Sequence, residues 1–193
     1  MKNIDKNITQ EMLDWFVDRT NRHIFLVGKY CRKIAEKFPE FSELNERLKV
    51  HDASKFEEPE IVPYVWITWK YKCIADGVEF SLFNPPEGLE ELMYAATEHH
   101  VLNPKNRHHP ECTCGKKSGI INRSNRDRPN PDEIIDATNM TDLDISEMCA
   151  DWLGVSEEKG NTAKAWADKN VGVRWRFTKA QEELIYKILS VFP

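Results

Sequence analysis

Apolar residues recur every three or four positions through most of this chain, and this helical period constrains its fold more than any other feature. The first periodic segment covers residues 9–38 and ends at Pro39, which cannot continue a helix. Strand-like alternation is scarce, and residues 171–177 are its one weak candidate. The pattern therefore predicts an all-α protein. Further helices are expected from Ser42 to His51, from near Pro59 (with Tyr64, Ile67, Tyr71 and Ile74 on one face), after Pro85-Pro86, from Asp144, over residues 162–170 and from Thr178 to the end.

Length and composition favour one folded domain over residues 1–193. The chain is 40% hydrophobic and 31% charged, a balance typical of globular rather than disordered proteins. No apolar run approaches the roughly 18–20 residues of a membrane span, and the N-terminus lacks the apolar core of a signal peptide. We therefore expect a cytoplasmic protein with no membrane partner, and the sequence leaves its oligomeric state open.

The charge pattern narrows the class of ligand. The formal net charge is −5, and basic residues are interspersed with acidic ones instead of forming a stripe. An extended nucleic acid is therefore not expected as a partner. A small phosphate ester is compatible, because one or two local cations suffice to bind it.

Histidines and aspartates stand at positions that helices would turn inward. His23 lies on the apolar stripe of the first helix, and His51, seven residues after Leu44, should face inward from the second, followed at once by Asp52. Asp151 lies on an otherwise apolar face of the helix that Asp144 and Glu147 are expected to open as a capping box. Imidazole and carboxylate ligands together suit borderline or hard divalent ions such as Zn, Mn, Fe, Co or Ni.

This order of ligands, His, then His-Asp, then Asp, resembles the HD superfamily of metal-dependent phosphohydrolases, whose fold is an all-helical bundle. The resemblance implies a metal site of His23, His51, Asp52 and Asp151. HD members with two metals have further histidines in between, where this chain has His99-His100 and His108-His109. We take His100, His108 and His109 as the added ligands, for one or two ions in all. The His-His-x-Glu element at residues 108–111 resembles the cyclic-dinucleotide branch, but the glycine- and tyrosine-rich signature that should follow is absent.

The same elements, with His-Asp-x-Ser-Lys-Phe at residues 51–56 and Glu-Met-x-x-Asp-Trp at 147–152, are also similar to an uncharacterised family frequent in phages. This resemblance covers roughly residues 20–152 and implies a phage or bacterial protein, acting in the host cytoplasm if viral.

The HD resemblance implies hydrolysis of a phosphate ester, most plausibly a nucleotide, by water that the metal activates. Asp52 belongs to the catalytic set, and Lys55 corresponds to a lysine that binds phosphate in two-metal relatives. Glu57, or its neighbour Glu58, is a candidate general acid.

The region from Val101 to about Pro131 reads as a long loop rich in His and Arg. Its arginines, of which we single out Arg107 as substrate-binding, could clamp a phosphate through bidentate hydrogen bonds. They are Arg107, Arg123, Arg126 and Arg128.

Several alternatives remain open from the sequence. His23 alone could be a core histidine, Asp136, Asp142 or Asp144 could replace Asp151, and Glu147 could serve only its helix cap. Cys112-x-Cys114 could bind a structural zinc, and Trp66 or Trp69 could stack on a base, although both are more simply core. At the level of function, the rivals are a di-iron oxygenase of HD type and a non-enzymatic phage binding protein with a structural metal site.

Overall fold

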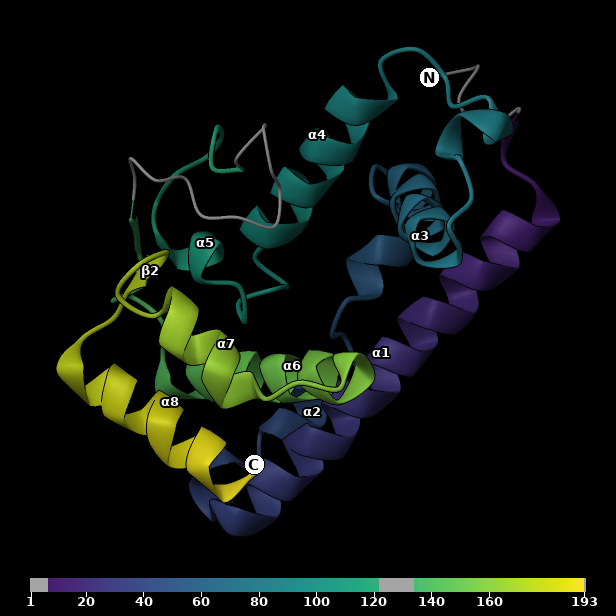
Figure 1. Ribbon diagram of the computed structural model, residues 1–193. Coiled ribbons are helices and arrows are strands. Elements are labelled where there is room, and N and C mark those ends of the chain that lie inside the picture. The colour runs from purple at the N-terminus through teal and green to yellow at the C-terminus, as the bar shows by residue number, and fades with distance from the viewer. Residues whose placement is uncertain (1–6, 122–133, 193) are drawn as a thin grey trace. The chain divides into compact units, whose positions relative to one another are not determined.

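The computed structural model describes residues 7–121 and 134–192, and helices dominate it (Figure 1). Two strands of two residues each pair in parallel, Ile135 with Trp175 and Asp136 with Arg176. The all-α prediction is thus confirmed. The α-helices are α1 (Gln10–Lys37), α2 (Leu44–Arg47), α3 (Ile61–Asp76), α4 (Leu89–Leu102), α5 (Pro110–Thr113), α6 (Asp142–Lys159), α7 (Ala163–Asn170) and α8 (Lys179–Val191). The 3₁₀ helices are η2 (Pro39–Phe41), η3 (Ala53–Phe56) and η4 (Phe80–Phe83), and the strands are β1 (Ile135–Asp136) and β2 (Trp175–Arg176).

The chain is divided between two compact units, each built from two separate segments. Unit 1 takes Met1–Arg22 and Ala53–His100, and unit 2 takes His23–Asp52 and Val101–Pro193. Each unit has a hydrophobic core of its own residues. The expectation of a single domain stays a prediction.

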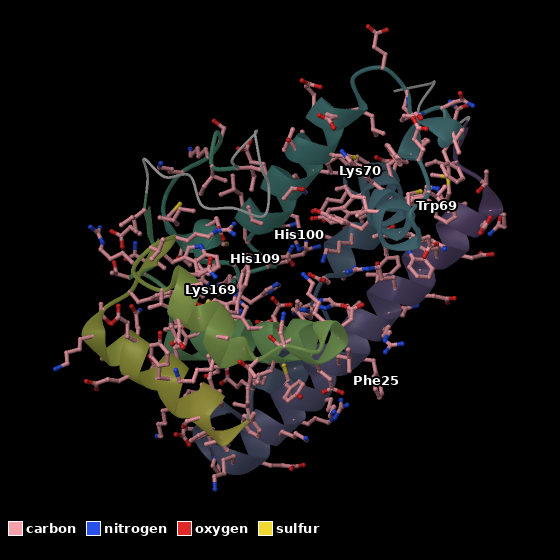
Figure 2. The ribbon with its side chains drawn as sticks, in the orientation of Figure 1. Phe25, Trp69, Lys70, His100, His109 and Lys169 are labelled. Atoms are coloured by element: carbon pink, nitrogen blue, oxygen red, sulfur yellow. The ribbon has the colours of Figure 1, made fainter. Side chains whose placement is uncertain are left out.

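The core of unit 1 is aromatic and is centred on α3, which carries Trp69 and Lys70 in Figure 2. Trp66 is fully buried, and its ring meets Phe80 edge to face with centroids 5.9 Å apart. Trp69 meets Phe83 in the same way at 5.1 Å. These contacts confirm that both tryptophans belong to the core.

The predicted inner face of α3 is wrong in its second half. Tyr64 and Ile67 are buried, but Tyr71 and Ile74 are exposed, Ile74 by 65%. Helix α3 is apolar around most of its circumference, and buried residues such as Val65 and Trp66 lie off the predicted stripe. The spacing of apolar residues therefore could not show which face of the helix is buried.

Helix α6 supplies much of the core of unit 2, where it packs on α7 and α8 (Figure 1). Its approach to α1 is unusually close at Gly154, where an added Cβ would lie 3.1 Å from the backbone nitrogen of Val27. Glycine therefore permits the contact that brings this part of α6 against α1. His23 lies one turn before Val27, and Asp151 lies one turn before Gly154, so the close approach also places these two side chains together.

Two local predictions in unit 2 need correction. The helix expected from Ser42 to His51 is α2, which ends at Arg47, and residues 48–52 form turns that end with Asp52 in the left-handed region at φ 58°. The N-cap of α6 is Thr141 rather than Asp144: the Thr141 hydroxyl accepts from the Asp144 N–H, and the Asp144 carboxylate accepts from the Thr141 N–H. Asp144 is therefore the third residue of a capping box.

The predicted long loop is interrupted by the short helix α5, and α4 extends two residues into it. Arg123, Arg126 and Arg128 lie outside the described residues. Within the described part of the chain, no helix combines the length and the apolar character that crossing a bilayer requires.

Candidate metal centre

Three of the predicted ligands meet inside unit 2. His23, His51 and Asp52 each offer a ligand atom, and these atoms lie within 4.8 Å of one another. The Nε2 atom of His23 is 3.3 Å from Asp52 Oδ2 and 3.1 Å from Asp151 Oδ1. Around one ion with bonds of about 2.1 Å, neighbouring ligand atoms stand roughly 3.0–3.4 Å apart. Buried histidine and carboxylate groups that could hold a metal ion are therefore present where the sequence predicts them.

Separate elements carry these side chains. His23 projects from α1, Asp151 from α6, and the His51-Asp52 pair from the turn that follows α2. The φ of 58° at Asp52 is uncommon for a residue with a Cβ, although aspartate tolerates it better than most. This backbone conformation ends the turn with the carboxylate 99% buried beside His23. Strained backbone of this kind concentrates at functional sites.

His51 is held by a carboxylate that the sequence analysis assigned only to a helix cap. Its Nδ1 lies 2.9 Å from Glu147 Oε1, so that Nδ1–H donates to the carboxylate. Its Nε2 atom is buried and has no hydrogen-bond partner among the described residues. A carboxylate on one ring nitrogen and a free lone pair on the other is the usual arrangement of a metal-binding histidine.

His108 and His109 adjoin this group, and Figure 2 marks His109 in the segment just before α5. The His108 ring lies 4.3 Å from that of His51 and 4.2 Å from that of His109. His108 Nδ1 is 3.5 Å from Glu147 Oε1, and its Nε2 is 3.9 Å from Asp52 Oδ1. Asp52, His108 and His109 also offer ligand atoms within 4.8 Å of one another.

A proton on His23 offsets part of the negative charge of the group. Burial alone lowers the pKa of His23, but the hydrogen bonds and charges of Asp151 and Asp52 outweigh it and raise the pKa to about 9. Burial raises the pKa of Asp151, yet the contact with His23 prevails and lowers it to about 2. A bound divalent cation would displace this proton, and its two positive charges would offset both carboxylates.

Comparison with known proteins assigns the chain to a family. A model of a family of unknown function, DUF5662, matches residues 12–191, a span that includes every predicted ligand. The chain belongs to DUF5662. No curated protein and no solved structure matches this DUF5662 chain.

Arg107 was predicted to bind substrate, and its guanidinium donates to the buried carboxylate of Asp144. Its Nε and Nη2 lie 3.2 and 3.1 Å from the two oxygens of Asp144. Two of its N–H groups are therefore occupied, while 44% of the side chain is exposed. A bidentate grip on phosphate by the same edge of the guanidinium would require Asp144 to be displaced.

The sequence analysis named Asp144 and Glu147 but missed the contacts that they make with residues outside their own helix. Both were assigned to a helix cap, but both are buried and contact groups from other segments. Burial raises the pKa of Glu147, and the contacts with His108 and His51 outweigh it and leave it well below its usual range. Glu147 stands one turn before Asp151, and that spacing on one helical face was the available signal.

Three predicted residues, Lys55, Glu57 and His100, belong to unit 1. His100 Nδ1 lies 2.9 Å from Glu60 Oε2, and Lys55 Nζ stands 5.4 Å from the centroid of the Tyr64 ring. Glu57 is exposed. The buried carboxylate of this region is instead Glu60, which also accepts from the Ser54 hydroxyl at 3.0 Å and contacts His99 Nδ1 at 2.7 Å.

The proposed cysteine site gains no support in the described part of the chain. Cys112 donates to the Asn103 carbonyl at 3.4 Å, and Cys114 donates to the Glu111 carbonyl at 3.1 Å. None of the described groups that could hold a metal includes a cysteine.

Proposed function

We propose that this DUF5662 member is a metal-dependent phosphohydrolase that acts on a phosphate ester, with nucleotides as the first candidates. The observation that carries the proposal is the convergence of His23, His51 and Asp52, with the lone pair of His51 Nε2 left for a ligand. The reaction class rests on the HD resemblance, in which this ligand order accompanies phosphate-ester hydrolysis.

The donor set fits a borderline divalent ion such as Mn, Fe, Co, Ni or Zn, because it mixes imidazole nitrogen with carboxylate oxygen. His23, His51 and Asp52 would hold the ion, and Asp151 is a fourth candidate because it lies 3.1 Å from His23 Nε2. A cation in this group would supply a water of lowered pKa and would polarise a phosphoryl oxygen.

The chain's own residues prepare the site in two ways. Glu147 fixes the tautomer of His51 by accepting from Nδ1, and burial of His51 and Asp52 lowers the local dielectric in which charges interact. His108 and His109 extend the group and are candidates for a second ion that shares Asp52. On the HD resemblance, Lys55 stays the proposed phosphate ligand.

The proposal is tested first by metal content and then by turnover. The purified protein is expected to retain about one or two equivalents of a transition metal by elemental analysis. His51→Ala and Asp52→Ala should both lose it. His99→Ala is the matched control, because His99 is also a histidine beside a carboxylate but lies in none of the described groups that could hold a metal. Full retention of metal by the His51 and Asp52 variants would refute the ligand assignment.

Turnover separates hydrolysis from its rivals. A panel of nucleoside mono-, di- and triphosphates and cyclic nucleotides is offered with Mn, Co, Ni or Zn. The wild type should release phosphate, pyrophosphate or nucleoside, or open a cyclic nucleotide to its monophosphate, and Asp52→Ala should not. Oxygen consumption by an iron-loaded sample, without phosphate release, would favour the oxygenase instead. A metal that stays bound without either activity would favour a structural role.

A further inference from the structure

Two acidic residues one turn apart on α6 receive matched contacts from two distant segments. Asp144 binds Arg47 from the end of α2 and Arg107 from the segment before α5. Glu147 contacts His51 and His108, at 2.9 and 3.5 Å. Each segment thus contributes one arginine that binds Asp144 and one histidine that contacts Glu147.

Arg47 contacts both of these acidic side chains. Its Nη1 lies 2.6 Å from Asp144 Oδ1, and its Nε lies 2.6 Å from Glu147 Oε2. The second contact is a close ion pair rather than a well-aligned hydrogen bond. All three side chains are mostly buried, with exposed fractions of 21% for Arg47, 1% for Asp144 and 3% for Glu147. Arg107, by contrast, contacts Asp144 but not Glu147 in the described part of the chain, and its side chain is 44% exposed.

Fixing one oxygen of a carboxylate fixes the other. While Arg47 holds Glu147 Oε2, the carboxylate cannot rotate about its terminal torsion without breaking that ion pair. Oε1 is thereby kept on His51 Nδ1, and His51 Nε2, which has no hydrogen-bond partner among the described residues, is kept as the nitrogen with the lone pair. Arg47 lies four residues before His51, so the turn that presents His51 is tied to α6 at both ends.

We propose that Arg47 is a positioning residue for the metal centre: by bridging Asp144 and Glu147, it fixes the Glu147 carboxylate that selects the tautomer of His51. The inference rests on the proposed metal site and adds a determinant of its affinity. Arg107 shares the Asp144 contact but does not bridge to Glu147, so this positioning role is not assigned to it.

The two arginines provide a matched comparison. Arg47→Met and Arg107→Met each remove an ion pair to Asp144, but only Arg47→Met frees Glu147. Arg47→Lys keeps the charge but has a compact ammonium that cannot span both acids, so it should behave as Arg47→Met does. It also supplies a second variant if Arg47→Met does not fold.

The first readout is the protonation pattern of the His51 ring, measured from side-chain ¹⁵N shifts and assigned with His51→Gln. The wild type and Arg107→Met should show Nδ1 protonated and Nε2 unprotonated. Both Arg47 variants should show a mixture of the two tautomers. The second readout is the dissociation constant for Zn or Mn, from competition with a chromophoric chelator, which should rise about 10–100-fold in the Arg47 variants, the range seen for residues behind metal ligands.

The outcomes separate this inference from the proposed function. An unchanged His51 tautomer in both Arg47 variants, with metal affinity equal to that of Arg107→Met, would overturn the positioning role. If the wild type binds neither metal while the tautomer still shifts in the Arg47 variants, the positioning of Glu147 and His51 by Arg47 stands and the metal proposal fails.

Discussion

Glu111 offers the sharpest test of how the histidine segment is anchored. It stands two residues after His109, is 98% buried, and accepts from the Trp175 indole N–H at 2.9 Å. Arg174 Nη2 lies 3.4 Å from the same oxygen. We predict that Glu111→Ala strongly destabilises unit 2, whereas Glu111→Gln, which keeps an acceptor for Trp175, does so much less.

The magnitude follows from the contacts that each variant loses. Leaving a buried indole N–H unsatisfied costs about 2 kcal/mol, within the usual range for such groups. Losing the partly buried ion pair with Arg174 adds about 1 kcal/mol. Glu111→Ala should therefore lower the free energy of unfolding by about 3 kcal/mol, a fall in Tm of roughly 6–12 °C for a chain of this length. Glu111→Gln should lose only about 1 kcal/mol, from the charge.

The assay is urea unfolding followed by near-ultraviolet circular dichroism. The stacked pair of Trp152 and Trp175, with ring centroids 5.5 Å apart and planes at 20°, should dominate that signal from unit 2. Equal stabilities for the two Glu111 variants would refute the reasoning, because it assigns most of the loss to the unsatisfied indole N–H.

Three further predictions concern α6 and the turn that follows α2. Gly154→Ala should destabilise by about 1 kcal/mol net, since crowding against the Val27 backbone outweighs the gain in helix propensity, and denaturant unfolding measures this. Burial raises the pKa of Asp144, but hydrogen bonds from Arg107, Thr141 and Arg47 hold it below its ordinary value. The resulting stability is present above the pKa of the unfolded state and is lost as pH falls through the lower folded value. Asp144→Asn should therefore be less stable at neutral pH and lose less on acidification below about pH 4, as a pH series of unfolding curves would show. Asp52→Gly should be about 1 kcal/mol more stable than Asp52→Ala in thermal melts, because both lack the carboxylate but only glycine adopts φ 58° freely.

The sequence predicted the parts of the fold that periodicity and capping residues determine. Helix α1 covers residues 10–37 where 9–38 was expected, and its end before Pro39 follows from the ring of proline. Thr178 caps α8 as predicted, since a Thr three residues before Gln181 forms a capping box. Strand β2 lies within residues 171–177, the one candidate strand. Its parallel partner β1 was not predicted, because a strand of two residues is too short to show alternation.

The candidate metal site was predicted as far as residue types and order allow. His23 was identified from its place on an apolar stripe, and it does face Asp52 and Asp151. The turn at residues 48–52 could not be read from the sequence, because no glycine marks the αL conformation of Asp52 and its contact with His23 appears only in the fold. For the same reason, Glu147 was taken for a cap: only tertiary contacts reveal that it accepts from His51.

Anomalous diffraction from crystals grown with Zn or Mn tests most directly whether a cation binds in unit 2. Data collected on either side of the absorption edge are predicted to show a peak about 2.0–2.2 Å from the Nε2 atoms of residues 23 and 51 and from a carboxylate oxygen of residue 52. A map with no anomalous peak among these three side chains, or with its peaks only at other sites, would contradict the account.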